Sequence, residues 1–188
     1  MIYLGQIPKK LLVIIGIVVA VVIIGIVIVV SGGKEPLPPP PEVTKKPVNE
    51  VLVDNVINVS LEKAFNIGSI LYGSDSRYPE TQDNVTTTEK FIKVVVQAQN
   101  VGKEESENNI WGIGDIIDSE GRRFPYSKTA DFWLPVENEC GSALKPGFTP
   151  VSCSRIYEIA KISEGLKVEV VSGAGIRAKK VGTIDLGI

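Results

Sequence analysis

Residues 11–30 are an unbroken run of 20 apolar residues, of which 15 are isoleucine or valine. An α-helix of this length spans about 30 Å, which is the thickness of the hydrocarbon core of a bilayer. A secretory signal peptide is the alternative, but its apolar stretch is only about 7–15 residues long. The run therefore predicts an uncleaved transmembrane helix, because a lone segment in lipid must satisfy its own backbone hydrogen bonds.

The charges that flank this run predict its orientation. Lys9 and Lys10 precede it, and the first ten residues contain no acid. Beyond the run, the first base is directly followed by an acid. By the positive-inside rule, we expect residues 1–10 in the cytoplasm and the chain from Ser31 onward outside the cell. The sequence thus predicts a single-pass cell-membrane protein with the lipid bilayer as one partner and an extracellular C-terminal domain.

Residues 31–48 form a Pro-rich linker that includes four consecutive prolines, Pro38–Pro41. Such a run favours polyproline II, a stiff spacer that gains about 3.1 Å per residue. We expect it to act as a stalk, and a docking site for a proline-binding module is the alternative. The remaining chain, residues 49–188, has the size of one domain and is long enough to bury a core.

Short β-rich runs and turn signals fill this domain, and no long helical period occurs in it. The clearest strand is Phe91–Asn100, in which Ile92, Val94, Val96 and Ala98 alternate with residues that are mostly polar. Gly114–Ile117, a turn at Asp118–Gly121 and Arg122–Phe124 predict a tight hairpin. Further strands are expected in the segments Val51–Leu71, Val151–Lys161, Leu166–Val170 and Val181–Leu186. Six to eight short strands predict an all-β, antiparallel β-sandwich.

Several segments of the domain occur in the order of a known family: Phe91–Lys103, Ile117–Phe124, Leu144–Gly147 and Ile156–Ile159. Together they resemble the immunoprotective-extracellular, immunoglobulin-like family, in the branch classed as domain of unknown function 4352. The resemblance implies a prokaryotic, membrane-anchored or lipoprotein chain with an immunoglobulin-like sandwich outside the cell, and it implies no particular enzymatic activity. The chain departs from the family pattern in two ways: its transmembrane helix lacks a lipobox cysteine, and it has an additional cysteine pair.

That pair, Cys140 and Cys153, makes up all the cysteine in the chain. A zinc site would need two further ligands, and the chain contains no histidine. Export to an oxidising compartment favours a disulfide that closes a short loop, and two free thiols are the alternative.

The lack of histidine also removes the usual general base of serine and cysteine triads. Carboxylate pairs could still perform acid–base chemistry, namely Asp115 with Asp118 and Glu137 with Glu139, but acids in turns are usually solvated. Glu104–Asn109 lacks the ligand spacing and the glycine of a calcium loop. We therefore predict no catalytic residues, no metal ligands and no cofactor. All 22 acids follow residue 30, and this acidic balance argues against binding nucleic acid.

Contact is the remaining class of function. Phe132, Trp133 and Leu134 form an apolar cluster in the loop Tyr126–Glu139, which would suit a contact loop if these side chains were exposed. For both Trp133 and Trp111, however, a core position is the stronger expectation, because the chain has few aromatic residues. The sequence favours a non-catalytic binding or adhesion module at the cell surface, with an unknown protein or surface partner.

A pilin-like or other structural subunit is the alternative function, in which the apolar N-terminal helix packs against other copies. Gly5 and Gln6 precede the apolar run, as in prepilins, but the Pro-rich linker does not continue the helix as pilins do. The sequence of the mature N-terminus distinguishes the two hypotheses: a start at Gln6 favours the filament, and a start at Met1 or Ile2 favours the anchor.

Overall fold

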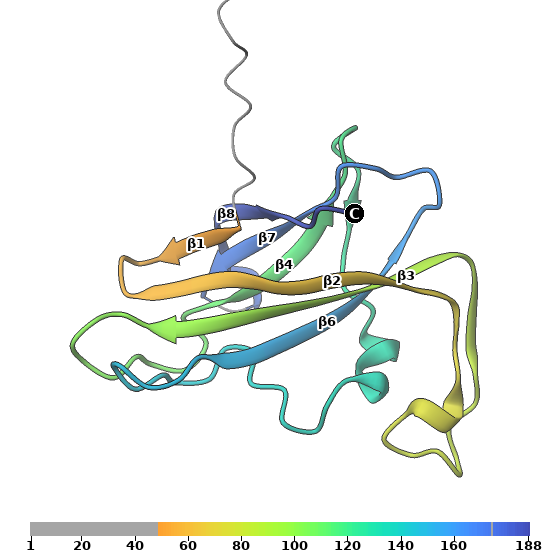
Figure 1. Cartoon of the computed structure of the whole chain (residues 1–188), viewed down its shortest axis with the longest axis horizontal. Coiled ribbons are helices and arrows are strands. Elements are labelled where there is room, and N and C mark those ends of the chain that lie inside the picture. The colour runs from red at the N-terminus through yellow and green to blue at the C-terminus, as the bar shows by residue number, and fades with distance from the viewer. Residues whose placement is uncertain (1–48, 174) are drawn as a thin grey trace, which may run out of the picture. The chain divides into compact units, whose positions relative to one another are not determined.

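Eight β-strands form two four-stranded antiparallel sheets in the computed structural model, which describes residues 49–173 and 175–188 (Figure 1). The first sheet has the order β1–β2–β3–β6, with strands Glu50–Val53, Ile57–Leu71, Val85–Asn100 and Val151–Ile159. The second has the order β5–β4–β7–β8, with strands Arg123–Phe124, Gly112–Ile117, Lys167–Ser172 and Lys179–Asp185. The prediction of an all-β antiparallel sandwich is thus confirmed for this part of the chain.

The strands begin and end within two residues of the predicted segments, apart from β3. β3 begins earlier than Phe91, at Val85, because Val85–Thr88 is a β-branched stretch that suits an extended strand. Three short 3₁₀-helices, which the strand pattern does not predict, connect the strands. They are η1 (Gly73–Asp75), η2 (Lys128–Trp133) and η3 (Gly175–Arg177).

The predicted cytoplasmic N-terminus (1–10), transmembrane helix (11–30) and Pro-rich linker (31–48) lie outside the residues that the structure describes. Within those residues, no helix combines the length and the apolar character that crossing a membrane requires.

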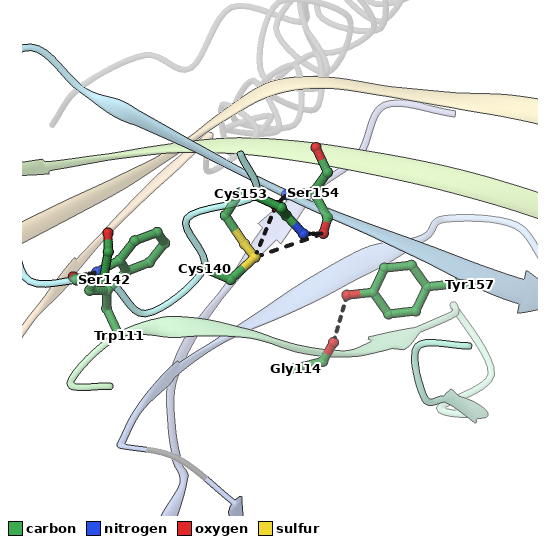
Figure 2. The surroundings of a disulfide bond; sticks show 8 residues. Trp111, Gly114, Cys140, Ser142, Cys153, Ser154 and Tyr157 are labelled. Carbon is green, nitrogen blue, oxygen red and sulfur yellow. Dashed lines mark hydrogen bonds between the residues drawn. A yellow bond between two sulfur atoms is a disulfide. The ribbon is translucent and has the colours of Figure 1, made fainter. Parts of the chain in front are cut away.

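The two sheets enclose one large apolar cluster, here called the inter-sheet core. Ile92, Val94, Val96 and Ala98 of β3 are all buried in it, as their alternation predicts. Trp111, directly before β4, is also fully buried there, and its indole Nε1 donates a hydrogen bond of 2.9 Å to the carbonyl of Ser142 (Figure 2). The hydroxyl of Tyr157 in β6 donates to the carbonyl of Gly114 in β4 at 2.8 Å and so links the two sheets.

A second, smaller cluster lies on the other face of the first sheet and is here called the outer cluster. Phe91 in β3 and Ile156 in β6 point to this face, because each is one position out of phase with the residues of the inter-sheet core. The cluster is completed by Leu71, Ala130, Trp133 and Leu134, so that η2 and the residues around it cover this end of the sheet.

The segment between β5 and β6 also covers the outer edge of β6, where the described chain has no further strand and only Tyr126 forms a bridge, to Tyr157. The side-chain amide of Asn138 accepts a 2.7 Å hydrogen bond from the backbone N–H of Ser154 and donates one of 3.0 Å to its carbonyl. This amide therefore takes the place of a neighbouring strand, and it protects the edge from pairing with another chain. A disulfide between Cys140 and Cys153 fixes the same segment to β6, with 4.6 Å between the Cα atoms (Figure 2).

Candidate functional site

The structure divides the predicted contact residues between the surface and the core. Phe132 is 43% exposed, whereas Trp133 and Leu134 are buried in the outer cluster. The indole Nε1 of Trp133 also donates a 2.7 Å hydrogen bond to the carbonyl of Tyr72. Of the three residues, Phe132 is therefore the one whose side chain can meet a partner without a rearrangement.

Phe132 lies beside the end of the β2–β3 hairpin, which Figure 1 shows extending beyond both sheets next to η2. Arg77 of the hairpin holds the two segments together. Its backbone N–H donates to the carbonyl of Phe132 at 2.8 Å, and its side chain donates to the carbonyls of Leu134 at 2.8 Å and Pro135 at 3.2 Å. The hairpin and η2 thus form one hydrogen-bonded unit.

Gly73 stabilises the turn of the hairpin within this unit. Its N–H donates to the side-chain oxygen of Asn84 at 2.7 Å. A Cβ atom at position 73 would come within 1.8 Å of the carbonyl oxygen of Gln82, so that no other residue fits without moving the backbone. This turn of the hairpin therefore requires glycine at position 73.

Exposed aromatic side chains gather on this unit, and we call Tyr72, Tyr78 and Phe132 the aromatic tip. The rings of Tyr78 and Phe132 meet edge to face with 5.8 Å between their centroids. Tyr72 and Tyr78 are each about half exposed, and Val136, on the segment that follows η2, is 81% exposed. Such a group of exposed apolar side chains is typical of a contact surface.

The carboxylates that the sequence offers as possible acid–base pairs lie in different surroundings in the structure. Asp118 is buried in the β4–β5 turn, where its oxygens accept hydrogen bonds from the N–H groups of Glu120 and Arg122 and from the side chains of Arg122 and Ser163. Burial by itself would raise the pKa of Asp118, but these bonds outweigh it and lower the pKa to about 2. Asp118 is therefore a fully bonded turn residue. Glu137 and Glu139 are both exposed.

Asp115 belongs to a charged group on the second sheet. It pairs with Arg123 at 3.1 Å, and Arg123 also pairs with Glu169, whose side chain is only 5% exposed. Lys180 approaches Glu169 from the other side at 3.3 Å. Burial acts to raise the pKa of Glu169, but the hydrogen bonds from Arg123 and Lys180 produce a net lowering of its pKa.

A cleft of about 390 Å³ opens next to this group, along the first half of β4. Arg155 of β6 lines it and stacks over the ring of Tyr126, with 4.7 Å from the guanidinium carbon to the ring centroid. Sequence reasoning did not single out Arg155. The signal was nevertheless present, because Arg155 alternates with Ser154 and Ile156 and so shares the face of Cys153 and Tyr157, both fully buried. A charged residue on an otherwise apolar face calls for an explanation.

Metal ligands do not gather anywhere in residues 49–173 and 175–188: no three histidine, cysteine, aspartate or glutamate side chains are grouped so that they could hold an ion.

No family model and no curated protein matches this sequence. Among solved structures, the chain is similar to a conserved hypothetical protein from Bacillus anthracis, with a TM-score of 0.46 and 15% sequence identity. The match covers 72% of this chain and 94% of that chain. The family to which the sequence segments point therefore stays a prediction.

Proposed function

We propose that this chain is a non-catalytic binding or adhesion module, anchored in the cell membrane by residues 11–30 and displayed outside the cell. The observation that carries the binding role is the aromatic tip. Three aromatic side chains are exposed there on a unit that Arg77, Gly73 and the buried Trp133 hold in place. Loops on a rigid scaffold are the usual carriers of binding, and aromatic residues are the usual anchors of interfaces.

The sandwich is, in this proposal, an immunoglobulin-like domain of the family that the sequence resembles. In that fold one sheet contains strands C, F and G and the other contains A, B and E. The order β5–β4–β7–β8 corresponds to C′–C–F–G, and β2–β3–β6 corresponds to A–B–E. The segment with η2 then stands where some immunoglobulin-like domains have strand D. The disulfide differs from the usual one, because it joins this segment to β6 and does not connect strands B and F.

Export is supported by the flanking charges and by the cysteine pair. Lys9 and Lys10 precede the apolar run, and disulfides persist in oxidising compartments outside the cytosol. Protease added to intact cells should cut between Gly32 and Pro47 and release the domain. Protection of the domain until the membrane is permeabilised would contradict the topology.

The role of the aromatic tip is tested with whole cells that carry the full chain. Replacing Tyr78 and Phe132 by serine should reduce attachment of the cells to one another or to surfaces several-fold, because the apolar contact area is lost. The matched control is Ile162→Ser, since Ile162 is 73% exposed but lies in the turn between β6 and β7, outside the tip. Display of each variant is measured with an antibody against the domain. Equal attachment by all three strains at equal display would refute the proposal.

A further inference from the structure

Arg155 is charged but points to the apolar side of β6. Its neighbours on that face, Cys153 and Tyr157, are fully buried, and Arg155 is itself partly buried. Within the described residues its guanidinium forms no salt bridge, and its Nε atom is removed from solvent without a hydrogen-bond acceptor. A side-chain donor that is shielded from water normally has an acceptor, so that this Nε–H lacks its usual partner.

The ring of Tyr126 stabilises this charge only in part. A guanidinium 4.7 Å from a ring centroid gains a cation–π attraction, and the stacking fixes its plane. Stacking uses the face of the guanidinium and none of its N–H donors. The terminal Nη–H donors of Arg155, unlike its buried Nε–H, therefore stay available to an acceptor.

The acids that line the same cleft do not supply that acceptor. Asp115 is paired with Arg123, and Glu169 is held between Arg123 and Lys180. Both carboxylates are already paired with cations, and neither forms a salt bridge with Arg155. An anion that pairs with Arg155 would therefore come from outside the described chain.

The cleft is large enough to hold a small organic anion. Its volume of about 390 Å³ lies in the range of small-molecule sites. Five glycines form much of its wall: Gly112, Gly114, Gly141, Gly173 and Gly175. A Cβ at Gly114 would press on Val171 at 3.1 Å, and one at Gly141 would lie 3.2 Å from the side-chain oxygen of Asn109. In addition, β5 pairs only with Ile116 and Ile117, which leaves the β4 residues beside the cleft without a strand partner on that side.

We propose that this cleft binds an organic ligand through a carboxylate group, which Arg155 grips with its N–H donors. The planar fork of a guanidinium matches the two oxygens of a carboxylate. A phosphate offers similar oxygens, but its second negative charge would find no free cation in the cleft, because Arg123 is already paired with Asp115 and Glu169. The site uses no residue of the aromatic tip, so that its test is independent of the proposed adhesion role.

The experiment follows the side-chain Nε–H resonance of Arg155 by NMR, in the full ¹⁵N-labelled chain in detergent micelles. The Arg155→Lys variant assigns this resonance by its loss. N-acetylglycine is the carboxylate probe, N-acetylglycinamide is its neutral counterpart, and inorganic phosphate is the dianion. We expect a saturable shift with N-acetylglycine, no shift with the amide and a weaker response to phosphate.

Variants then separate binding from folding, with the backbone amides of Gly114 and Gly141 as reporters. Arg155→Lys should weaken the binding of N-acetylglycine at least tenfold, because a lysine cannot donate in a planar fork. Tyr126→Leu should weaken it less, because it removes only the stacking partner. Lys103→Gln, which removes an exposed charge in the loop after β3, should leave the affinity unchanged.

Three results would overturn the proposal. They are the lack of a saturable response to N-acetylglycine, an equal response to its amide, and a response to phosphate as strong as that to the carboxylate. If Arg155→Lys fails to fold, the titration of the unaltered chain and of Tyr126→Leu decides the question. Unchanged affinity in Tyr126→Leu would also count against the site, because the ring fixes the plane of the guanidinium.

Discussion

The inter-sheet core and the outer cluster differ in origin and in what each stabilises. The inter-sheet core takes side chains from both sheets, and their burial follows from simple alternation along the strands. The outer cluster has six buried residues on one end of one sheet, and it depends on η2 covering Phe91 and Ile156. We therefore expect the first cluster to control whether the domain folds, and the second to control whether the aromatic tip has a fixed shape. The two tryptophans, one in each cluster, allow this difference to be tested.

Trp111→Ala should have the largest effect on stability. Its side chain is 1% exposed in the inter-sheet core, and truncation also removes the hydrogen bond to the carbonyl of Ser142. We expect a loss of about 3–5 kcal/mol in the free energy of unfolding, as for other buried tryptophans. Denaturant unfolding measures it, with Trp133 as the remaining fluorescent reporter. Trp111→Phe is the control and should lose less, whereas an unchanged midpoint in Trp111→Ala would contradict the assignment of this residue to the core.

Trp133→Ala should cost about 3 kcal/mol, and its effect should be local. Hydrogen exchange should accelerate in residues 72–84 and 128–134, because Trp133 holds η2 to the carbonyl of Tyr72. The amides of β4 and β7 should keep their protection. If protection fell equally in both sheets, the outer cluster would be part of a single cooperative core, and the distinction between the two clusters would fail.

The sequence predicts these two regions to different extents for a physical reason. In β3, the alternation of Ile92, Val94, Val96 and Ala98 with mostly polar residues is enough to predict the inter-sheet core. Phe91 and Ile156 break the polar pattern on the opposite face, and this signals that something covers that face. The sequence does not identify the segment that covers this face, because a 3₁₀-helix such as η2 is too short to show a hydrophobic period.

The same limit of sequence-based prediction applies to the candidate site. The sequence identifies Phe132, Trp133 and Leu134 as an apolar group, but consecutive residues of a short helix point in different directions. Only the tertiary contacts of η2 decide that Phe132 is exposed while its two neighbours are buried. The cleft at Arg155 could not be predicted either, since it depends on the stacking of Tyr126 and on the pairing of Arg123 with Asp115 and Glu169.

Removing the disulfide should lower the free energy of unfolding about as much as Trp133→Ala does, but it should act on the inter-sheet core. The bond joins residues 13 positions apart, and a closed loop of about this length contributes roughly 3 kcal/mol on the chain-entropy model. This loop includes Leu144, which packs in the inter-sheet core. The double variant Cys140→Ser, Cys153→Ser should therefore unfold at lower denaturant concentration, while hydrogen exchange in residues 72–84 stays slow. The intact mass should rise by that of two hydrogen atoms when the unaltered protein is reduced, and two alkylatable thiols before reduction would refute the bond.

Lowering the pH should destabilise the domain through Asp118, which lies in the β4–β5 turn of the second sheet. Since the pKa of Asp118 is about 2 in the folded chain and its ordinary value is 3.8, its contribution to stability is present above pH 3.8 and is lost as the pH falls towards 2. The lowered pKa of Glu169 acts in the same direction. Asp118→Asn should flatten the dependence of unfolding free energy on pH in this window. Ser163→Ala, which removes one of the bonds to Asp118, should give an intermediate slope. An unchanged slope in Asp118→Asn would show that other groups control acid unfolding.

Phe132→Ser should have the smallest effect on stability, although Phe132 is next to a core residue. Its ring is 43% exposed and contacts Tyr78 edge to face, and such an exposed aromatic pair is worth about 0.5–1 kcal/mol. Denaturant unfolding of Phe132→Ser beside Trp133→Ala measures the contrast between adjacent positions. A loss as large as that of Trp133→Ala would place Phe132 in the outer cluster and remove it from the contact surface. Near-native stability combined with weakened cell attachment would separate the two roles, because the scaffold would then be intact while the surface it presents has changed.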